Sequence, residues 1–303
     1  MKKIFLTMAT LLTMGAALYV TTSCNGGQKA VAKHVIIIGL DGWGSYSMDS
    51  AQAPNIRQYM AEGCYTLFKR TIRPSVSGPN WAAQMNGTPL ESTGYTQNSP
   101  EPTFKPLYLT EHNEQPTFFH LMRQQYPDAE TGVVCEWGDF LNYADTLCLS
   151  YFKRIDEPSE NHESIVEEST KYIKEKKPAL LFIHIDALDH AGHSFGRGTP
   201  EYYQALEHAD GQIAQIVEAI KEAGIYDDSV LILTSDHGHD GTGHGGDSLY
   251  EIETPFVIWG KGIKKGEEIT ETMIQYDVAA TVAKILNLQT PQSWRGVPMS
   301  VFK

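Results

Sequence analysis

The sequence predicts an α/β fold in which a mostly parallel sheet carries helices on both faces. From residue 35 onward, short apolar runs alternate with longer amphipathic segments, the pattern of strands joined by covering helices. Carboxylate and imidazole side chains directly follow three of the apolar runs, where open α/β sheets place their ligand sites. Of the 303 residues, 41% are hydrophobic and 20% are charged, so the chain can bury a sizeable core.

Each predicted element follows from its local pattern. The strands are short apolar runs bounded by turn-forming residues, at 35–40, 131–135, 179–185, 230–234 and 255–259. The clearest helix follows Thr199 and Pro200, repeats apolar residues every three or four positions from Leu206 to Ile220, and stops at Gly224. Further helices are predicted at 55–62, 81–85, 117–125, 163–174 and 277–286. The stretches 99–115 and 136–160 lack clean periodicity, and we expect them to be substrate-binding insertions in one domain.

The N-terminal segment is predicted to stand apart from this domain. Residues 1–23 combine Lys2 and Lys3 with an apolar run over 4–20, the layout of an export signal. Residues 21–24 resemble a bacterial lipobox that ends in Cys24, which would carry a lipid anchor, and residues 24–33 would form a tether. Ordinary signal cleavage, leaving a soluble secreted protein, is the alternative. We therefore expect export, as a lipoprotein of the periplasm or outer membrane or as a secreted protein, with residues 34–303 as a single catalytic domain.

Charge and cysteine content exclude several classes. A net charge of −13 repels nucleic-acid backbones, so no nucleic-acid polymer is expected as a partner, whereas a small phosphorylated substrate at a metal site is compatible. The membrane is expected to be a partner only through the possible anchor on Cys24. Cys64, Cys135 and Cys148 show no CxxC spacing and predict neither a disulfide framework nor a thiolate zinc site. Cys135 and Cys148 could pair, or all could be buried free thiols.

Three strand ends carry residue types that bind divalent ions. Asp41 follows the first strand and stands beside glycines, although it could also be a turn former. Asp189 and His193 follow the strand at 179–185, four residues apart, so one helical turn or tight loop aims both at one point. The glycine-rich loop after 230–234 carries Asp236, His237, His239 and His244. Nitrogen and oxygen donors without Cys suit zinc, with manganese or another divalent ion as competitor.

A nucleophile is available at Ser77, which begins a predicted helix in the segment Ser77-Gly-Pro-Asn80-Trp81. The amide groups of a helix N-terminus can hold a phosphoryl group, and a metal ion can lower the pKa of a hydroxyl enough to make it a nucleophile. The alternative is that Ser77 is the N-cap of that helix, a role compatible with the first.

With these motifs in place, the mature chain resembles the alkaline phosphatase superfamily, in particular its phosphodiesterase and nucleotide pyrophosphatase branch. The resemblance implies an alkaline-phosphatase-like fold and a pair of zinc ions. It assigns one ion to Asp41, Ser77, Asp236 and His237. It assigns the other to Asp189 and His193 of a D-x-x-G-H motif and to one later His, for which we prefer His244. We judge His239 too near His237 to reach the second ion easily.

The resemblance also implies a function, hydrolysis of phosphodiester or pyrophosphate bonds through a Ser77 phospho-enzyme intermediate. Diesterases of this branch carry an Asn 21 positions after the nucleophile that binds the transferring group, which here is Asn98. The branch commonly has T-F-P-N where this chain has Ser77-Gly-Pro-Asn80, which weakens an inference to nucleotides. A sulfatase is disfavoured because Trp81 replaces the Arg of its modification motif, and the export signal argues against a cytoplasmic mutase.

Alternatives remain open at this point. A phosphomonoesterase or a phosphonate-ester hydrolase would use the same metals and Ser77, and a non-catalytic surface protein could bind a phosphorylated or sulfated ligand. Trp81 and Tyr95 could stack on substrate, although aromatic side chains beside a site are more often wall and core. Lys105, His112 and His190 are weaker candidates for substrate contact.

Overall fold

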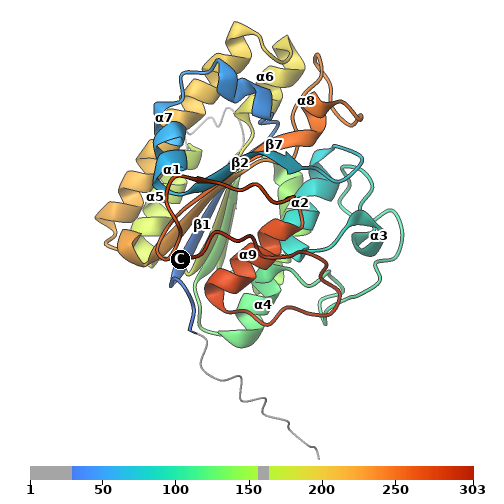
Figure 1. Ribbon diagram of the computed structural model, residues 1–303. Helices are drawn as coiled ribbons and strands as arrows, with labels where there is room; N and C mark the ends of the chain where they lie inside the picture. The colour runs from blue at the N-terminus through green and yellow to red at the C-terminus, as the bar shows by residue number, and fades with distance from the viewer. Residues whose placement is uncertain (1–28, 156–163) are drawn as a thin grey trace, which may run out of the picture.

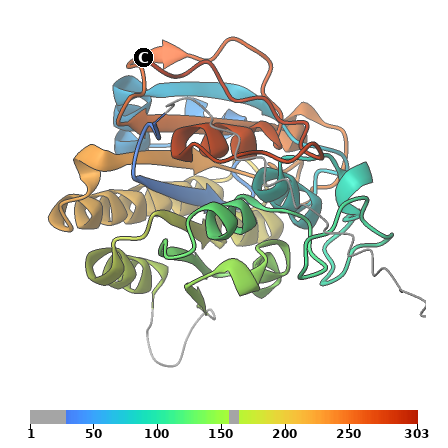
Figure 2. The same cartoon turned by 90° about the horizontal axis from the view of Figure 1, so that it is seen from below.

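A computed structural model of the protein describes residues 29–155 and 164–303. They form one eight-stranded sheet in the order β4-β3-β5-β1-β6-β7-β2-β8, with helices on both faces (Figures 1 and 2). This architecture confirms the predicted fold class. Residues 1–28 and 156–163 lie outside the described part of the chain, so the export signal, the lipobox and the Cys24 anchor remain predictions.

The middle of the sheet is parallel. Strand β1 (His34–Leu40) lies between β5 (Leu180–Ile185) and β6 (Ser229–Thr234) and runs parallel to both. Strand β3 (Thr131–Cys135) extends the parallel part beside β5 and pairs with β4 (Tyr151–Arg154). Strands β1, β3, β5 and β6 are buried on both faces because helices cover both, which is why they appear as continuous hydrophobic runs in the sequence, whereas the edge strand β4 is partly exposed.

The other edge contains an antiparallel strand. Strand β7 (Glu253–Gly260) runs antiparallel to β6 and to β2 (Cys64–Arg70), and the short β8 (Glu267–Glu268) is parallel to β2. The sequence predicted β7 but missed β2. Buried and partly exposed residues intermix along β2, and Lys69 and Arg70 stand at its end, so no continuous apolar run marks it.

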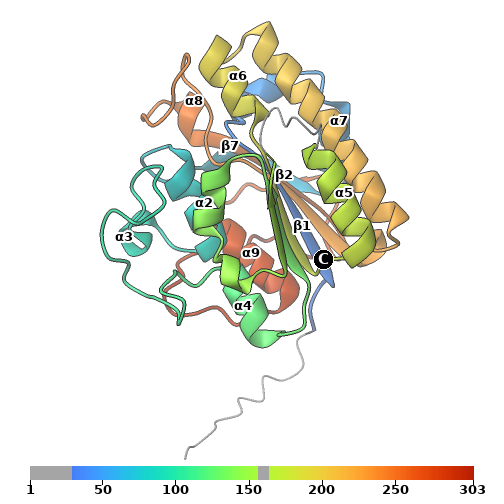
Figure 3. The same ribbon diagram turned by 180° about the vertical axis from the view of Figure 1, so that it is seen from behind.

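Two helical layers bury the sheet. On one face, the side chains of Ile36, Ile38 and Leu40 pack in a core with four helices, α1 (Pro54–Glu62), α5 (Ile165–Lys176), α6 (Ala187–Phe195) and α7 (Pro200–Glu222). On the other, Val35 and Ile37 pack in a core with α2 (Ser77–Asn86), α4 (Phe118–Gln125) and α9 (Asp277–Leu286) (Figure 3). Successive residues of β1 thus serve opposite layers, as the two-residue period of a strand requires.

Helix α7 shows how closely local signals set an element. The Thr199 hydroxyl accepts a hydrogen bond from the backbone N–H of Tyr202, and Pro200 occupies the first turn, where its missing N–H costs nothing. The helix ends at Glu222, and Gly224 follows with φ +72°, a conformation that glycine adopts without strain. The short helices α3 (Leu90–Thr93) and α8 (Leu249–Ile252) and helix α6 were not predicted as such.

The structure also bears on the predicted insertions, on the cysteines and on membrane-spanning helices. The first predicted insertion, 99–115, is irregular, whereas the described part of the second contains two 3-10 helices, Gly138–Tyr143 and Thr146–Cys148, and strand β4. Cys64, Cys135 and Cys148 are buried, and no disulfide joins Cys135 to Cys148. Within the described residues, no helix is both long and apolar enough to cross a membrane.

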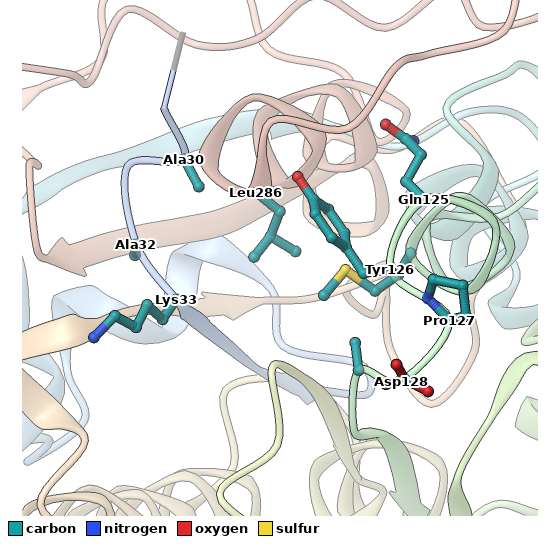
Figure 4. Close-up of a pocket in the computed structure, with 10 residues that line it drawn as sticks. Ala30, Ala32, Lys33, Gln125, Tyr126, Pro127, Asp128 and Leu286 are labelled. Atoms are coloured by element: carbon teal, nitrogen blue, oxygen red, sulfur yellow. The ribbon is translucent and has the colours of Figure 1, made fainter. Parts of the chain in front are cut away.

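A pocket of about 520 Å³, shown in Figure 4, lies beside the amino end of β1. Its wall includes Lys33 just before β1, Tyr126 just after α4 and Leu286 at the end of α9. The lining contains no cluster of metal-binding side chains, so this pocket has none of the chemistry that the sequence motifs place at the other edge.

Candidate metal centre and active site

The metal-type residues converge because their strands are neighbours. Asp41 follows β1, Asp189 lies in the first turn of α6 just after β5, and Asp236 lies just after β6. Strands β5, β1 and β6 are adjacent and parallel, so their carboxyl ends share one edge of the sheet. The structure therefore brings together residues that are almost 200 positions apart in sequence.

The first cluster contains Asp41, Asp236 and His237, whose donor atoms all lie within 4.8 Å of one another. His237 Nε2 is 3.4 Å from Asp41 Oδ1 and 3.2 Å from Asp236 Oδ2. The Ser77 hydroxyl lies 3.1 Å from the same nitrogen. All three cluster residues are buried, and both of these carboxylate oxygens lack a hydrogen-bond partner. A divalent ion would satisfy both unpartnered oxygens, so the residues present fit such an ion.

The remaining oxygens of these carboxylates are held from behind. Asp41 Oδ2 accepts a hydrogen bond from Trp81 Nε1 at 3.0 Å and lies 2.9 Å from His184 Nε2. Asp236 Oδ1 accepts from the backbone N–H of Gly42 at 3.2 Å. Each carboxylate is thus oriented through one oxygen and presents the other to the cluster, as outer-shell partners of metal ligands do.

The second cluster comprises one carboxylate and three imidazoles, again within 4.8 Å: Asp189, His193, His239 and His244. Asp189 Oδ1 lies 3.1 Å from His239 Nε2 and 3.8 Å from His244 Nε2, and Asp189 Oδ2 lies 3.4 Å from His193 Nε2. His193 Nε2 and His244 Nε2 are 3.2 Å apart. Nitrogen and oxygen donors at this density match the coordination that zinc takes in proteins.

Backbone carbonyls select which imidazole nitrogen is free. His193 Nδ1 lies 2.9 Å from the carbonyl oxygen of Thr242, and His244 Nδ1 lies 3.0 Å from that of Ser75. His237 Nδ1 lies 3.1 Å from the carbonyl oxygen of Gly238. A carbonyl can only accept, so each Nδ1 carries the proton and each Nε2 presents a lone pair to its cluster. This is the tautomer that a metal-binding histidine needs.

The reason given from sequence against His239 is wrong. Although only one residue separates it from His237, the chain turns so that both imidazoles reach the site, and the rings of His239 and His244 are 5.4 Å apart. His239 is fully buried, and a Cβ on Gly192 would come within 2.4 Å of its ring. The glycine of the D-x-x-G-H motif therefore makes room for His239. Sequence spacing alone did not show this, because it depends on the packing of α6 against the loop.

Ser77 is the first residue of α2, and the N-cap is Val76, so Ser77 does not serve as the N-cap. The Asn98 side chain lies at the same helix end, where its Oδ1 accepts a hydrogen bond from the backbone N–H of Gly78 at 2.7 Å. This bond leaves the Asn98 amide group as a donor beside Ser77. The structure thus brings Ser77 and Asn98 together, as the 21-residue spacing implied.

The aromatic candidates lie deeper than a stacking role requires. Trp81 is fully buried and contributes its indole N–H to Asp41. Tyr95 is 4% exposed, and its hydroxyl donates to the carbonyl oxygen of Asn142. These positions correct the suggested stacking on substrate and correspond to the wall-and-core alternative. Trp81 acts on the site through Asp41 instead.

Sequence reasoning missed two buried polar residues next to the site. His184 lies inside the apolar strand β5, where its only signal is an imidazole within a hydrophobic run. Burial lowers the pKa of His184 to about 3, so it is neutral beside Asp41. Lys69 on β2 is fully buried and donates hydrogen bonds of 2.6 Å to the carbonyl oxygen of Ser235 and to Gln275 Oε1, which supports the chain just before Asp236.

Burial shifts the pKa values of the first cluster and of His244 in the second. Burial, reinforced by the Asp236 carboxylate, raises the pKa of Asp41 well above its ordinary value. Burial and the nearby Asp189 raise the pKa of Asp236 to about 7. Burial lowers the pKa values of His237 and His244. Neutral imidazoles and carboxylates that resist ionisation without a cation are the electrostatic signature of a metal-binding site.

Comparison with solved structures places the fold. A 2-O GAG sulfatase matches with a TM-score of 0.72 at 13% identity, covering 88% of this chain and 73% of that one. Human ectonucleotide pyrophosphatase / phosphodiesterase 5 matches with a TM-score of 0.69 at 14% identity, covering 87% of this chain and 97% of that one. These matches show that the chain has an alkaline-phosphatase-like fold.

Sequence comparison gives the family. The model of type I phosphodiesterase / nucleotide pyrophosphatase matches residues 35–257, and the chain belongs to this family. Among curated relatives, the bis(5'-adenosyl)-triphosphatase ENPP4 of Bos taurus is 21% identical over 72% of this chain and 50% of its own. A phosphopentomutase of Alkaliphilus metalliredigens is 33% identical over 41% of this chain and 30% of its own. The chain thus spans half or less of the length of these two relatives.

Proposed function

We propose that the protein is a metal-dependent hydrolase of phosphate esters that acts on phosphodiester or pyrophosphate bonds, with Ser77 as the nucleophile. The observation that carries this proposal is the position of Ser77. Its hydroxyl lies 3.1 Å from His237 Nε2, at the first turn of α2 and beside two buried carboxylate oxygens without partners. Family membership supports the same chemistry, and the ENPP4 relative is named for cleaving a dinucleoside triphosphate.

Two divalent ions, zinc being the best match to the donors, are proposed as cofactors. Asp41, Asp236, His237 and Ser77 would hold one, and Asp189, His193 and His244 the other, with His239 as an added ligand. Bound there, the ions would neutralise the phosphoryl group and lower the pKa of the Ser77 hydroxyl. Each of the two groups of donors combines imidazole nitrogens with carboxylate oxygens, which favours two ions over a single one.

The chain's own residues would then perform the reaction in two stages. Ser77 Oγ attacks phosphorus, forms the phosphoseryl bond and expels the first alcohol or phosphate, while the hydroxyl proton passes to solvent. The Asn98 amide donates to a non-bridging oxygen, and the positive end of the α2 dipole favours the anion. Water then attacks phosphorus, breaks the phosphoseryl bond and restores the Ser77 hydroxyl.

The test compares bis-p-nitrophenyl phosphate, p-nitrophenyl phosphate and p-nitrophenyl sulfate on zinc-loaded protein, with a chelator control. We expect chelator-sensitive turnover that favours the diester, and loss of turnover with retained zinc in Ser77→Ala. Ser169→Ala is the matched control, because Ser169 is also buried but lies on α5. Preference for the monoester would indicate a phosphomonoesterase instead. Zinc-loaded protein that cleaves none of the three substrates would support a binding role.

We further propose that the enzyme acts outside the cytoplasm. The support is the sequence of residues 1–24, with its basic start, apolar run and terminal Cys24. Fractionation of cells that express the full chain should place the wild type with membranes and Cys24→Ala in the soluble exported fraction. Recovery of both in the soluble exported fraction would favour ordinary signal cleavage, and cytoplasmic recovery of both would refute export.

A further inference from the structure

A third cluster of metal-binding side chains lies outside the candidate active site, where the two predicted insertions meet helix α4. It combines four side chains whose donor atoms all lie within 4.8 Å of one another: His112, His120, Asp145 and Cys148. His112 comes from the irregular stretch after α3, and His120 is on α4. Asp145 and Cys148 flank and end the short 3-10 helix Thr146–Cys148. The cluster therefore joins three segments that share no strand.

The separations between donor atoms suit tetrahedral coordination. Cys148 Sγ lies 3.7 Å from Nδ1 of both His112 and His120. Asp145 Oδ2 lies 3.0 Å from His112 Nδ1, 3.8 Å from His120 Nδ1 and 3.1 Å from Cys148 Sγ. Zinc bonds of about 2.0–2.3 Å at tetrahedral angles require donors roughly 3.3–3.8 Å apart, so small shifts suffice to bind an ion.

Burial and backbone conformation point to the same conclusion. The Asp145 side chain is 1% exposed, and its carboxylate lies within ion-pair distance of both imidazoles. Asp145 also adopts φ +49°, a left-handed conformation that costs a non-glycine residue energy. The partners of this buried carboxylate include the His112 imidazole and the Cys148 thiol, both of which can bind an ion together with it. Thiolate and carboxylate together carry the two negative charges that neutralise a divalent cation.

Glu111 adds an outer carboxylate to the cluster. One of its oxygens lies 3.9 Å from His112 Nε2 and the other lies 3.9 Å from His120 Nε2, on the far side of each ring from the cluster. The Glu111 side chain is largely exposed, so it can close the short distance to a hydrogen bond. A carboxylate behind a coordinating imidazole is a common arrangement in zinc sites, because it fixes the ring and the tautomer.

We propose that His112, His120, Asp145 and Cys148 form a structural zinc site, separate from the catalytic pair. The cluster includes a thiolate and lies apart from Ser77, the proposed nucleophile, and a thiolate among four protein ligands is typical of a structural zinc site. The Cys148 thiol releases its proton to solvent as the sulfur–zinc bond forms. Sequence spacing did not predict this site because its ligands are contributed by separate segments and only one is a cysteine.

The position of the site gives it a role in shaping the active-site wall. The 3-10 helix that ends at Cys148 follows another 3-10 helix, Gly138–Tyr143. The Tyr143 hydroxyl at the end of this earlier helix donates a hydrogen bond of 3.2 Å to the carbonyl oxygen of Ser99. Ser99 follows Asn98, which is bound to the start of α2. A zinc ion that ties residues 112, 120, 145 and 148 together would therefore hold the loop that carries Asn98.

Cobalt substitution tests the proposal with a readout that the catalytic clusters cannot give. They contain only nitrogen and oxygen donors, so a thiolate-to-cobalt charge-transfer band reports on a cysteine ligand alone. We expect this band, with tetrahedral visible bands, in the wild-type full chain. It should vanish in Cys148→Ser and persist in Cys135→Ser, the matched buried thiol. Zinc content should fall by one equivalent in Cys148→Ser only.

A second variant keeps the test decisive if Cys148→Ser fails to fold. His112 is the most exposed of the ligands, so His112→Asn should fold and retain the thiol while binding cobalt at least tenfold more weakly at this site. Chelation should lower the melting temperature of the wild type more than that of His112→Asn. Cobalt-loaded wild type without a thiolate band, a band that survives Cys148→Ser, or unchanged cobalt affinity in His112→Asn would each overturn the proposal.

Discussion

The indole N–H of Trp81 donates a hydrogen bond of 3.0 Å to Asp41 Oδ2, the carboxylate oxygen that faces away from the cluster. Asp41 Oδ1, by contrast, has no hydrogen-bond partner and lies 3.4 Å from His237 Nε2. One buried aromatic residue thereby fixes which oxygen of a metal-type carboxylate is available. We infer that Trp81, which the sequence suggested as a substrate contact, instead positions the Asp41 carboxylate.

Replacing Trp81 by Phe removes this donor while keeping most of the ring packing. We expect Trp81→Phe to weaken metal binding at the first cluster by about 10–100-fold, as loss of an outer-shell partner does. Competition against a fluorescent zinc chelator measures the change. Trp259→Phe is the control, because Trp259 is equally buried but stacks on Tyr59 on the other face of the sheet. Equal zinc affinity in wild type and Trp81→Phe would refute the positioning role.

His239 and His244 distinguish two versions of the second cluster. Because the rings of both lie against Asp189, we expect His239→Ala and His244→Ala each to weaken the second ion by at least about tenfold. Zinc content after dialysis at limiting free zinc provides the measurement. His208→Ala, on the exposed face of α7, is the control. If His239→Ala keeps full zinc occupancy at the second cluster, the ligands of that ion are Asp189, His193 and His244 without His239.

Asn98 should matter for the reaction and not for the metals. Asn98→Ala removes the donor beside Ser77, and we expect kcat/KM for the diester to fall about 10²–10³-fold with unchanged zinc content. Asn98→Asp retains an acceptor for the Gly78 N–H and loses the amide donor. If the Asp variant keeps wild-type activity, the role of Asn98 is limited to holding the start of α2.

Metal loading should depend on pH in a definite direction. The pKa of Asp236 is raised to about 7 by burial and Asp189, so the metal-free protein keeps a proton there below that pH. An incoming cation must displace this proton, and its affinity therefore weakens by up to about tenfold per unit as pH falls below about 7. Calorimetric titrations in buffers of different ionisation enthalpy should show proton release. Binding without proton release at pH near 6 would contradict this protonation state.

Much of the fold was accessible from local sequence patterns. Helix α7 begins and ends where its cap and stop residues indicate, because these interactions involve neighbours along the chain. Strand β2 escaped prediction because its stability comes from pairing with β7 and because its Lys69 is buried by tertiary contacts with Ser235 and Gln275. Local propensity carries no record of such partners.

The fold class and the residue types at three strand ends can be predicted from local patterns, because apolar runs followed by Asp and His involve neighbours along the chain. Which atoms of those residues are available to an ion depends on contacts between distant segments. The carbonyl oxygen of Ser75 sets the tautomer of His244, and the Trp81 indole orients Asp41. Gly192 leaves the space that His239 occupies. The cluster around Cys148 was invisible for the same physical reason, since coordination is a property of proximity in space.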